Sequence, residues 1–221
     1  MTEPPAIERD DLGFVHRFVP PATPGAATLL LLHGTGGDEN DLIELGTLLL
    51  PGAALLSPRG KVLEHGSPRF FRRLAMGVFD EPDLTRRSRE LATFVGAAAA
   101  AYELDPTRVF AVGFSNGANI AASIFLLHPG VLRGGVLLRA MVPLEPPKRP
   151  DLAGVPIYIA AGRFDPMIPV ANAERLAVMF EEAGAEVRLA WDDQGHNLAP
   201  DEVDAARRWL AQRTELQASE S

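Results

Sequence analysis

One short stretch, residues 109–119, constrains the fold more than any other part of the chain. It reads Val-Phe-Ala-Val-Gly-Phe-Ser-Asn-Gly-Ala-Asn. A run of strand-forming residues (109–112) precedes a Gly-Phe-Ser-Asn-Gly turn, and apolar residues then recur at helical spacing as far as Leu127. A serine in such a strand-turn-helix unit is held in a strained turn, and its hydroxyl projects from the edge of a sheet. The stretch therefore predicts that Ser115 is a nucleophile, an ordinary glycine-bounded turn being the alternative.

The rest of the chain alternates between predicted strands and predicted helices. Unbroken apolar runs, typical of strands covered on both faces, occupy residues 28–32, 53–57, 135–138 and 155–161; an edge strand is predicted at 14–19 and an outer strand at 187–191. Besides the helix after Ser115, helices are predicted at residues 38–48, 84–102, 170–183 and 200–210. This order predicts an α/β fold, a mostly parallel twisted sheet with helices on both faces.

Composition narrows the class of protein. The 221 residues suit a single domain, 1–221, with loose polar ends at about 1–11 and 211–221. The net charge of −8 argues against nucleic acid or an anionic membrane as partner, so a small molecule is expected. The absence of cysteine excludes disulfides and thiolate metal sites. The sequence shows neither a membrane-spanning run nor a signal peptide, so we expect a cytoplasmic protein, with no metal and no cofactor.

Two further residues complete a candidate catalytic set with Ser115. Asp165 and His196 each follow a predicted strand, and the carboxyl ends of parallel strands gather at one edge of a sheet. A serine hydroxyl needs a base with a pKa near 7, which histidine supplies, and a carboxylate holds the imidazole in the right tautomer. The order Ser, Asp, His is that of α/β-hydrolase triads. The competing carboxylates are Asp192 and Asp193; the competing bases are His16, His33, His65 and His128.

A glycine-rich loop after the first buried strand suits an oxyanion hole. It reads His-Gly-Thr-Gly-Gly from His33. A tetrahedral intermediate needs two convergent N–H donors, and we expect these to be the backbone amides of Thr35 and Asn116. The alternative is a tight turn that leads into a helix cap.

Three motifs together resemble a known family. They are Leu-His-Gly-Thr-Gly-Gly-Asp-Glu-Asn-Asp-Leu, Gly-Phe-Ser-Asn-Gly-Ala-Asn and Gly-Arg-Phe-Asp-Pro-Met-Ile-Pro. The chain resembles, from about residue 14 to 212, the phospholipase/carboxylesterase (acyl-protein-thioesterase-like) branch of the α/β hydrolases. Within that branch, two further motifs, Ser-Pro-Arg-Gly-Lys-Val-Leu-Glu and Pro-Arg-Phe-Phe-Arg-Arg-Leu-Ala, resemble those of the bacterial carboxylesterases called hydroquinone-linked hydrolases. The resemblance implies the α/β-hydrolase fold, the triad and oxyanion residues named above, and a homodimer. Asn116 stands where eukaryotic thioesterases usually have glutamine, which argues against protein depalmitoylation.

The long loop at residues 61–83 is a candidate cover for the site. Its aromatic residues, with Phe71 and Phe79 foremost, either contact substrate or anchor the loop to the core, and Arg72 or Arg73 either binds a substrate carboxylate or is solvated. Met141 and Met167 lie in other loops at the same edge and are candidates for an acyl pocket.

The predicted function is that of a cofactor-independent serine carboxylesterase. Its substrates are expected to be small short-to-medium acyl or aryl esters, cleaved through an acyl-enzyme. The alternatives are an acyl thioesterase, a cofactor-free haloperoxidase that uses the same triad, and a non-catalytic ligand-binding protein on the same scaffold.

Overall fold

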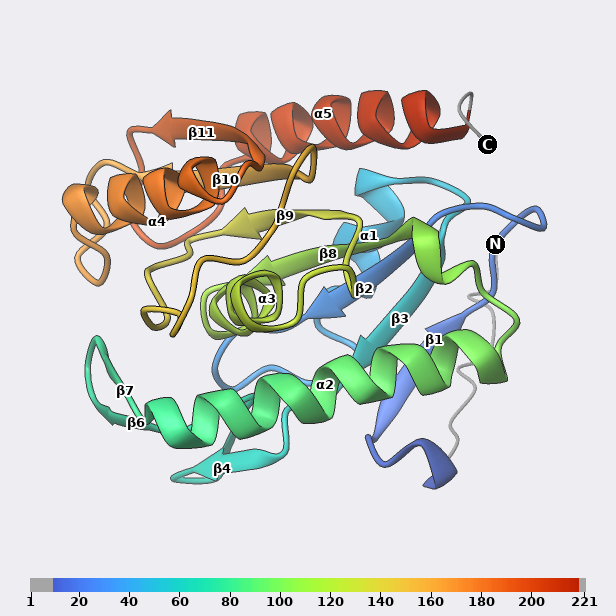
Figure 1. Ribbon diagram of the computed structural model, residues 1–221, viewed down its shortest axis with the longest axis horizontal. Coiled ribbons are helices and arrows are strands. Elements are labelled where there is room, and N and C mark those ends of the chain that lie inside the picture. The colour runs from blue at the N-terminus through green and yellow to red at the C-terminus, as the bar shows by residue number, and fades with distance from the viewer. Residues whose placement is uncertain (1–9, 219–221) are drawn as a thin grey trace.

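A seven-stranded sheet runs through the centre of the structure, a computed structural model that describes residues 10–218 (Figure 1). The strands lie in the order β1-β3-β2-β8-β9-β10-β11. Their bounds are His16–Val19 (β1), Thr28–Leu32 (β2), Ala54–Pro58 (β3), Val109–Phe114 (β8), Gly134–Leu138 (β9), Pro156–Gly162 (β10) and Glu186–Asp192 (β11). Edge strand β1 pairs antiparallel with β3, and the other neighbours pair in parallel. The predicted mostly parallel sheet, with β1 and β11 at its edges, is confirmed.

The leucine run of β2 shows why the central strands lack polar alternation. Leu29 and Leu31 pack in the apolar core on one side of the sheet, and Leu30 and Leu32 pack in the core on the other side. Both faces of the strand are therefore covered, so every position is apolar.

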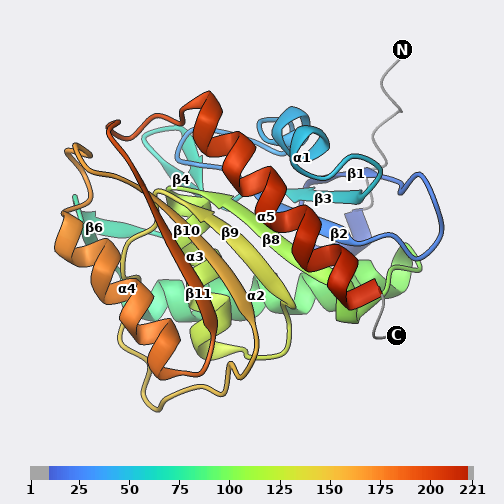
Figure 2. The same cartoon turned by 90° about the horizontal axis from the view of Figure 1, so that it is seen from above.

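Helices cover both faces of the sheet, as predicted (Figure 2). α1 (Ile43–Leu49) and α5 (Pro200–Ala218) pack on one face; α2 (Glu81–Ala101), α3 (Asn116–Leu127) and α4 (Val170–Glu182) pack on the other. Short 3₁₀ turns lie at Asp10–Leu12 and Pro106–Arg108. In the part of the chain that the structure describes, no helix combines the length and the apolar character needed to cross a bilayer.

The C-terminal end of the chain differs from the prediction. The C-terminal end was predicted to be loose from residue 211, but α5 continues to Ala218. Its last turns are held because Thr214 is buried with its hydroxyl donating to the carbonyl of Leu210, and because Arg213 pairs with Glu186 of β11 at 2.7 Å. The prediction of a loose N-terminal end, 1–11, lies outside the described residues except for the 3₁₀ turn that begins at residue 10.

The acidic run before α1 is not part of the helix, contrary to the prediction that a helix begins at residue 38. α1 begins at Ile43. The Asp38 carboxylate accepts the backbone N–H of Asn40, which makes a local turn, and Glu39 binds Arg59 through two hydrogen bonds. These acidic side chains have partners outside the helix, so they do not act as its cap.

The segment predicted as a long loop, 61–83, contains two short β-hairpins. β4 (Val62–Glu64) pairs with β5 (Ser67–Arg69), and β6 (Arg73–Ala75) pairs with β7 (Val78–Phe79). The backbone groups of this long connection are thereby satisfied without a place in the central sheet.

Candidate active site

Ser115 occupies the sharp turn between β8 and α3. Its φ of 51° and ψ of −112° are a conformation that residues with a side chain rarely adopt. The glycines on either side make the turn feasible. A Cβ on Gly117 would come within 1.9 Å of the carbonyl oxygen of Leu32, and one on Gly113 within 2.7 Å of the backbone nitrogen of Ala118. The predicted strained turn is therefore present, and glycine is required at both flanking positions.

A continuous chain of contacts joins a carboxylate, an imidazole and the Ser115 hydroxyl. His196, in the loop after β11, has its Nε2 at 2.9 Å from the Oγ of Ser115 and its Nδ1 at 2.7 Å from the Oδ2 of Asp165, which follows β10. The other oxygen of Asp165 accepts the backbone N–H groups of Met167 and Ile168 at 2.8 and 3.2 Å. The carboxylate is thereby fixed, and it orients the imidazole toward the hydroxyl.

The competing histidines are placed elsewhere. His16, His33 and His128 make hydrogen bonds within the fold, and His65 lies exposed in the turn between β4 and β5. Burial lowers the pKa of His33, whose Nε2 accepts the N–H of Gly60. His33 therefore acts as a neutral brace at the start of the glycine-rich loop.

Arg139 braces the loop that carries His196. It lies at the end of β9 with a φ of 57°, and its side chain is fully buried. Its Nε donates to the carbonyl of Gly195 at 2.9 Å, and its Nη2 donates to the carbonyl of Asn197 at 2.7 Å. These carbonyls belong to the two neighbours of His196, so Arg139 fixes the backbone on both sides of the imidazole.

The competing carboxylates are paired with arginines. Asp192 binds Arg139 at 2.9 Å, and Glu202 of α5 binds the same guanidinium. Burial lowers the pKa of Arg139, but these two carboxylates outweigh it and raise that pKa above its usual value. Asp193 is 80% exposed and lies 3.6 Å from Arg163. Neither Asp192 nor Asp193 contacts His196.

Thr35 and Asn116 are the residues whose backbone amides are predicted to form the oxyanion hole. Both residues line a cleft together with Ser115 and His196. Within residues 10–218, no carbonyl takes up either N–H group. Asn116 is the first residue of α3, so its N–H also lies at the positive end of the helix dipole. Backbone amides without a carbonyl partner in the same cleft as the serine meet one requirement of an oxyanion hole, so both residues stay candidates for it.

The end of β5 and the residue after it hold Thr35 and Asn116 in place. Nη1 of Arg69 donates to the hydroxyl of Thr35 at 2.8 Å, and the N–H of Phe70 donates to the Oδ1 of Asn116 at 2.8 Å. The Asn116 side chain, which distinguishes this chain from the thioesterases it resembles, therefore ties the serine turn to the hairpins.

Of the four residues predicted to bind substrate, the structure places three at the cleft. Phe79, Met141 and Met167 line it. Phe71 does not: it is fully buried, and its ring packs edge-on against Phe79 with 5.0 Å between centroids. That prediction is wrong because this aromatic ring anchors the hairpins to the core. The cleft encloses about 390 Å³, including space open to solvent, and further lining residues that were not predicted are Arg69, Met76, Asn119, Arg139 and Ile168.

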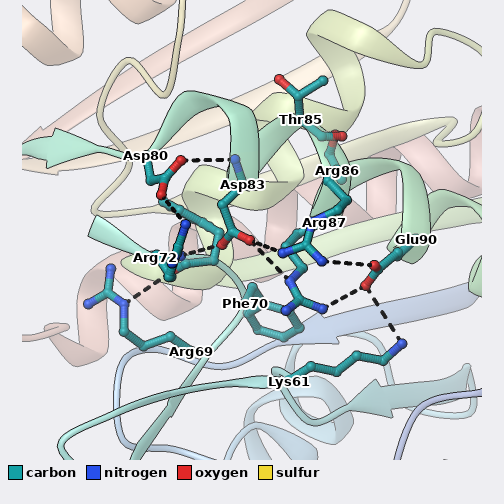
Figure 3. A network of polar contacts seen from close by, with 12 residues as sticks. Lys61, Arg69, Phe70, Arg72, Asp80, Asp83, Thr85, Arg86, Arg87 and Glu90 are labelled. Atoms are coloured by element: carbon teal, nitrogen blue, oxygen red, sulfur yellow. Dashed lines mark hydrogen bonds and ion pairs between the residues drawn. The ribbon is translucent and has the colours of Figure 1, made fainter. Parts of the chain in front are cut away.

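A network of charges fastens the hairpins to the first turn of α2 (Figure 3). The buried carboxylate of Asp83 accepts the backbone N–H of Arg72 at 2.8 Å and also binds Arg86 and Arg87. The Arg72 side chain binds Asp80, at 2.6 Å, and is not among the residues that line the cleft. Burial raises the pKa of Asp83, but the Arg72 amide and the two arginines outweigh it and hold that pKa below its usual range.

We expect Asp83→Asn to lower the free energy of unfolding by about 1.5–3 kcal/mol near pH 7, because hydrogen bonds to an ionised group are lost. The folded-state pKa of Asp83 is lowered, so its contribution is complete above the unfolded-state pKa of about 3.9 and is lost as the pH falls through the folded-state pKa. The free energies of unfolding of the wild type and the variant, measured with urea, should therefore converge as the pH is lowered toward 3. Glu81→Gln, which removes an exposed carboxylate from the same turn, is the control. A difference that persists undiminished at low pH would contradict the assignment.

Comparison with known proteins identifies the family of the chain. A family model described as phospholipase/carboxylesterase matches residues 15–213. MhqD of Bacillus subtilis (strain 168) is 49% identical over 181 residues, which are 82% of this chain and 90% of that protein. The crystal structure of the Bacillus cereus carboxylesterase is 45% identical with a TM-score of 0.88, covering 90% of this chain and 94% of that one. A carboxylesterase from Mesorhizobium loti is 32% identical with a TM-score of 0.88, covering 93% and 98%. The chain therefore belongs to the phospholipase/carboxylesterase family and has the α/β-hydrolase fold.

Proposed function

We propose that this protein is a serine carboxylesterase that hydrolyses small short-to-medium acyl or aryl esters through an acyl-enzyme on Ser115. One observation carries the proposal: the unbroken contact chain from Asp165 through His196 to the hydroxyl of Ser115. The family and the carboxylesterase neighbours support ester hydrolysis as the reaction.

The reaction follows from the roles of the groups at the site. The Oγ of Ser115 attacks the ester carbonyl while Nε2 of His196 takes its proton, and Asp165 stabilises the imidazolium. The amides of Thr35 and Asn116 hold the negative oxygen of the tetrahedral intermediate. The intermediate collapses, the alcohol leaves with the proton from His196, and water then repeats the sequence to release the acid and free Ser115.

A fluorophosphonate, which phosphonylates an activated serine, tests the proposal. We expect hydrolysis of p-nitrophenyl acetate and butyrate, with activity lost in proportion to one phosphonyl group per chain, located on Ser115 by mass spectrometry of peptides. Hydrolysis that persists after Ser115 is labelled, or labelling elsewhere, would contradict the mechanism. Protein without hydrolysis of either ester would favour the ligand-binding alternative. Parallel assays with the butyryl thioester and with halide plus peroxide distinguish the thioesterase and haloperoxidase alternatives.

A further inference from the structure

Arginine side chains line the cleft at Ser115, although the protein is acidic. The whole chain has a net charge of −8. Among the described residues that line the cleft, however, the charged side chains are the arginines Arg69, Arg73 and Arg139, and no Asp or Glu is present. A guanidinium group that faces a cleft and has unused N–H donors is suited to bind an anion.

Arg139 is not available to a bound anion, because Asp192 and Glu202 both bind it. The other two arginines belong to the hairpins. Arg69 and Arg73 share one carboxylate: Nη1 of Arg69 lies 3.1 Å from one oxygen of Glu64, and Nε of Arg73 lies 2.9 Å from the other. Two positive charges and one negative charge leave a net charge of +1 at this wall of the cleft.

These charges are held close together. Burial and the neighbouring Arg73 both lower the pKa of Arg69, and hydrogen bonding to Arg73 keeps the pKa of Glu64 below its usual range. Both arginines stay protonated at neutral pH, as guanidinium groups do in proteins, and Glu64 stays ionised. An additional anion would therefore relieve repulsion between the two guanidinium groups.

Arg73 has the donors to bind such an anion. Besides Glu64, its hydrogen-bond partner in the described part of the chain is the thioether of Met76, at 3.5 Å, which is a weak acceptor. Its side chain is 24% exposed, whereas that of Arg69 is 3% exposed and bonded to Thr35. Arg69 thus fixes the wall, and Arg73 presents free N–H groups to the cleft in the fork geometry that suits a carboxylate.

We propose that the substrates are esters that bear a carboxylate, which Arg73 binds beside the fixed guanidinium of Arg69. This inference rests on the proposed function and specifies its substrate class. The cleft is also lined by Met141, Met167 and Ile168, which are apolar and suit the uncharged part of the ester.

The test compares esters that differ in one carboxylate. In the acyl arm, mono-p-nitrophenyl adipate is compared with p-nitrophenyl hexanoate; the adipate chain is too long for its carboxylate to attack its own ester efficiently. In the alcohol arm, 4-acetoxybenzoate is compared with its methyl ester.

We expect the wild type to favour the anionic ester in at least one arm, with the preference weakening as salt is added. Arg73→Gln should lower kcat/KM for that ester about 10- to 100-fold, mainly through KM, and leave its neutral counterpart within about twofold.

Arg72→Gln is the matched control, because Arg72 is adjacent in sequence and paired with one carboxylate but does not line the cleft. It should leave the preference unchanged. The inference is overturned if neither arm shows a preference, if Arg73→Gln affects both members of a pair equally, or if Arg72→Gln has the same effect. When hydrolysis depends on Ser115, each of these results overturns only the inference and leaves the proposed function intact. Failure of both anionic and neutral esters to react through Ser115 overturns the proposed function as well.

Discussion

Ser115→Ala is expected to remove nearly all ester hydrolysis, lowering kcat/KM for p-nitrophenyl butyrate by about 10⁴-fold or more. The change deletes the atom that we propose forms the acyl-enzyme, the Oγ that lies 2.9 Å from His196. The oxyanion donors and the cleft remain, and such groups alone give modest residual catalysis in other enzymes. Steady-state kinetics on matched preparations measure the loss.

Ser123→Ala is the appropriate control for this experiment. Ser123 lies on the same helix, α3, is fully buried, and donates its hydroxyl to the carbonyl of Asn119 without lining the cleft. We expect it to retain activity, and we expect the urea unfolding curves of both variants to stay close to that of the wild type. An Ser115→Ala protein that is folded and still hydrolyses the ester by acyl transfer would overturn the mechanism.

The fold could be predicted where the local sequence pattern and the packing around a position call for the same type of residue. The leucines of β2 are apolar at every position because the strand is covered on both sides, so the run predicts a central parallel strand. The glycines around Ser115 are required by contacts under 3 Å that a Cβ would make. Asp165 and His196 were predicted from chain order because parallel strands bring their following loops to one edge.

The parts that could not be predicted depend on which long-range partner a side chain finds. Phe71 and Phe79 are alike in sequence, but one is buried in the core and the other reaches the cleft. The last turns of α5 have the composition of a polar tail, and the ion pair between Arg213 and Glu186 of β11 is not visible in the sequence. A role for Arg139 at the site is weakly indicated by the sequence, because Arg139 directly follows a predicted strand, as the other loops of the site do.

Arg139→Met is expected to have the second large effect, on both stability and turnover. It leaves the buried Glu202 without its guanidinium partner, and removing one member of a buried ion pair typically costs about 3–5 kcal/mol. It also removes the donors to the carbonyls of Gly195 and Asn197. Because a displaced catalytic group can cost about 100-fold in rate, we expect kcat to fall by that order even where the variant is fully folded.

The double variant Arg139→Met/Glu202→Gln separates the two effects. Neutralising Glu202 removes the unpaired buried charge, so urea unfolding should show that much of the lost stability returns. The carbonyls beside His196 still lack their donors, so kcat should stay low while KM changes little. Arg163→Met, which removes the exposed partner of Asp193 from the same edge of the sheet, should change neither the free energy of unfolding nor kcat appreciably. If kcat recovers together with stability in the double variant, Arg139 serves only the fold; if stability recovers alone, Arg139 positions His196 for proton transfer.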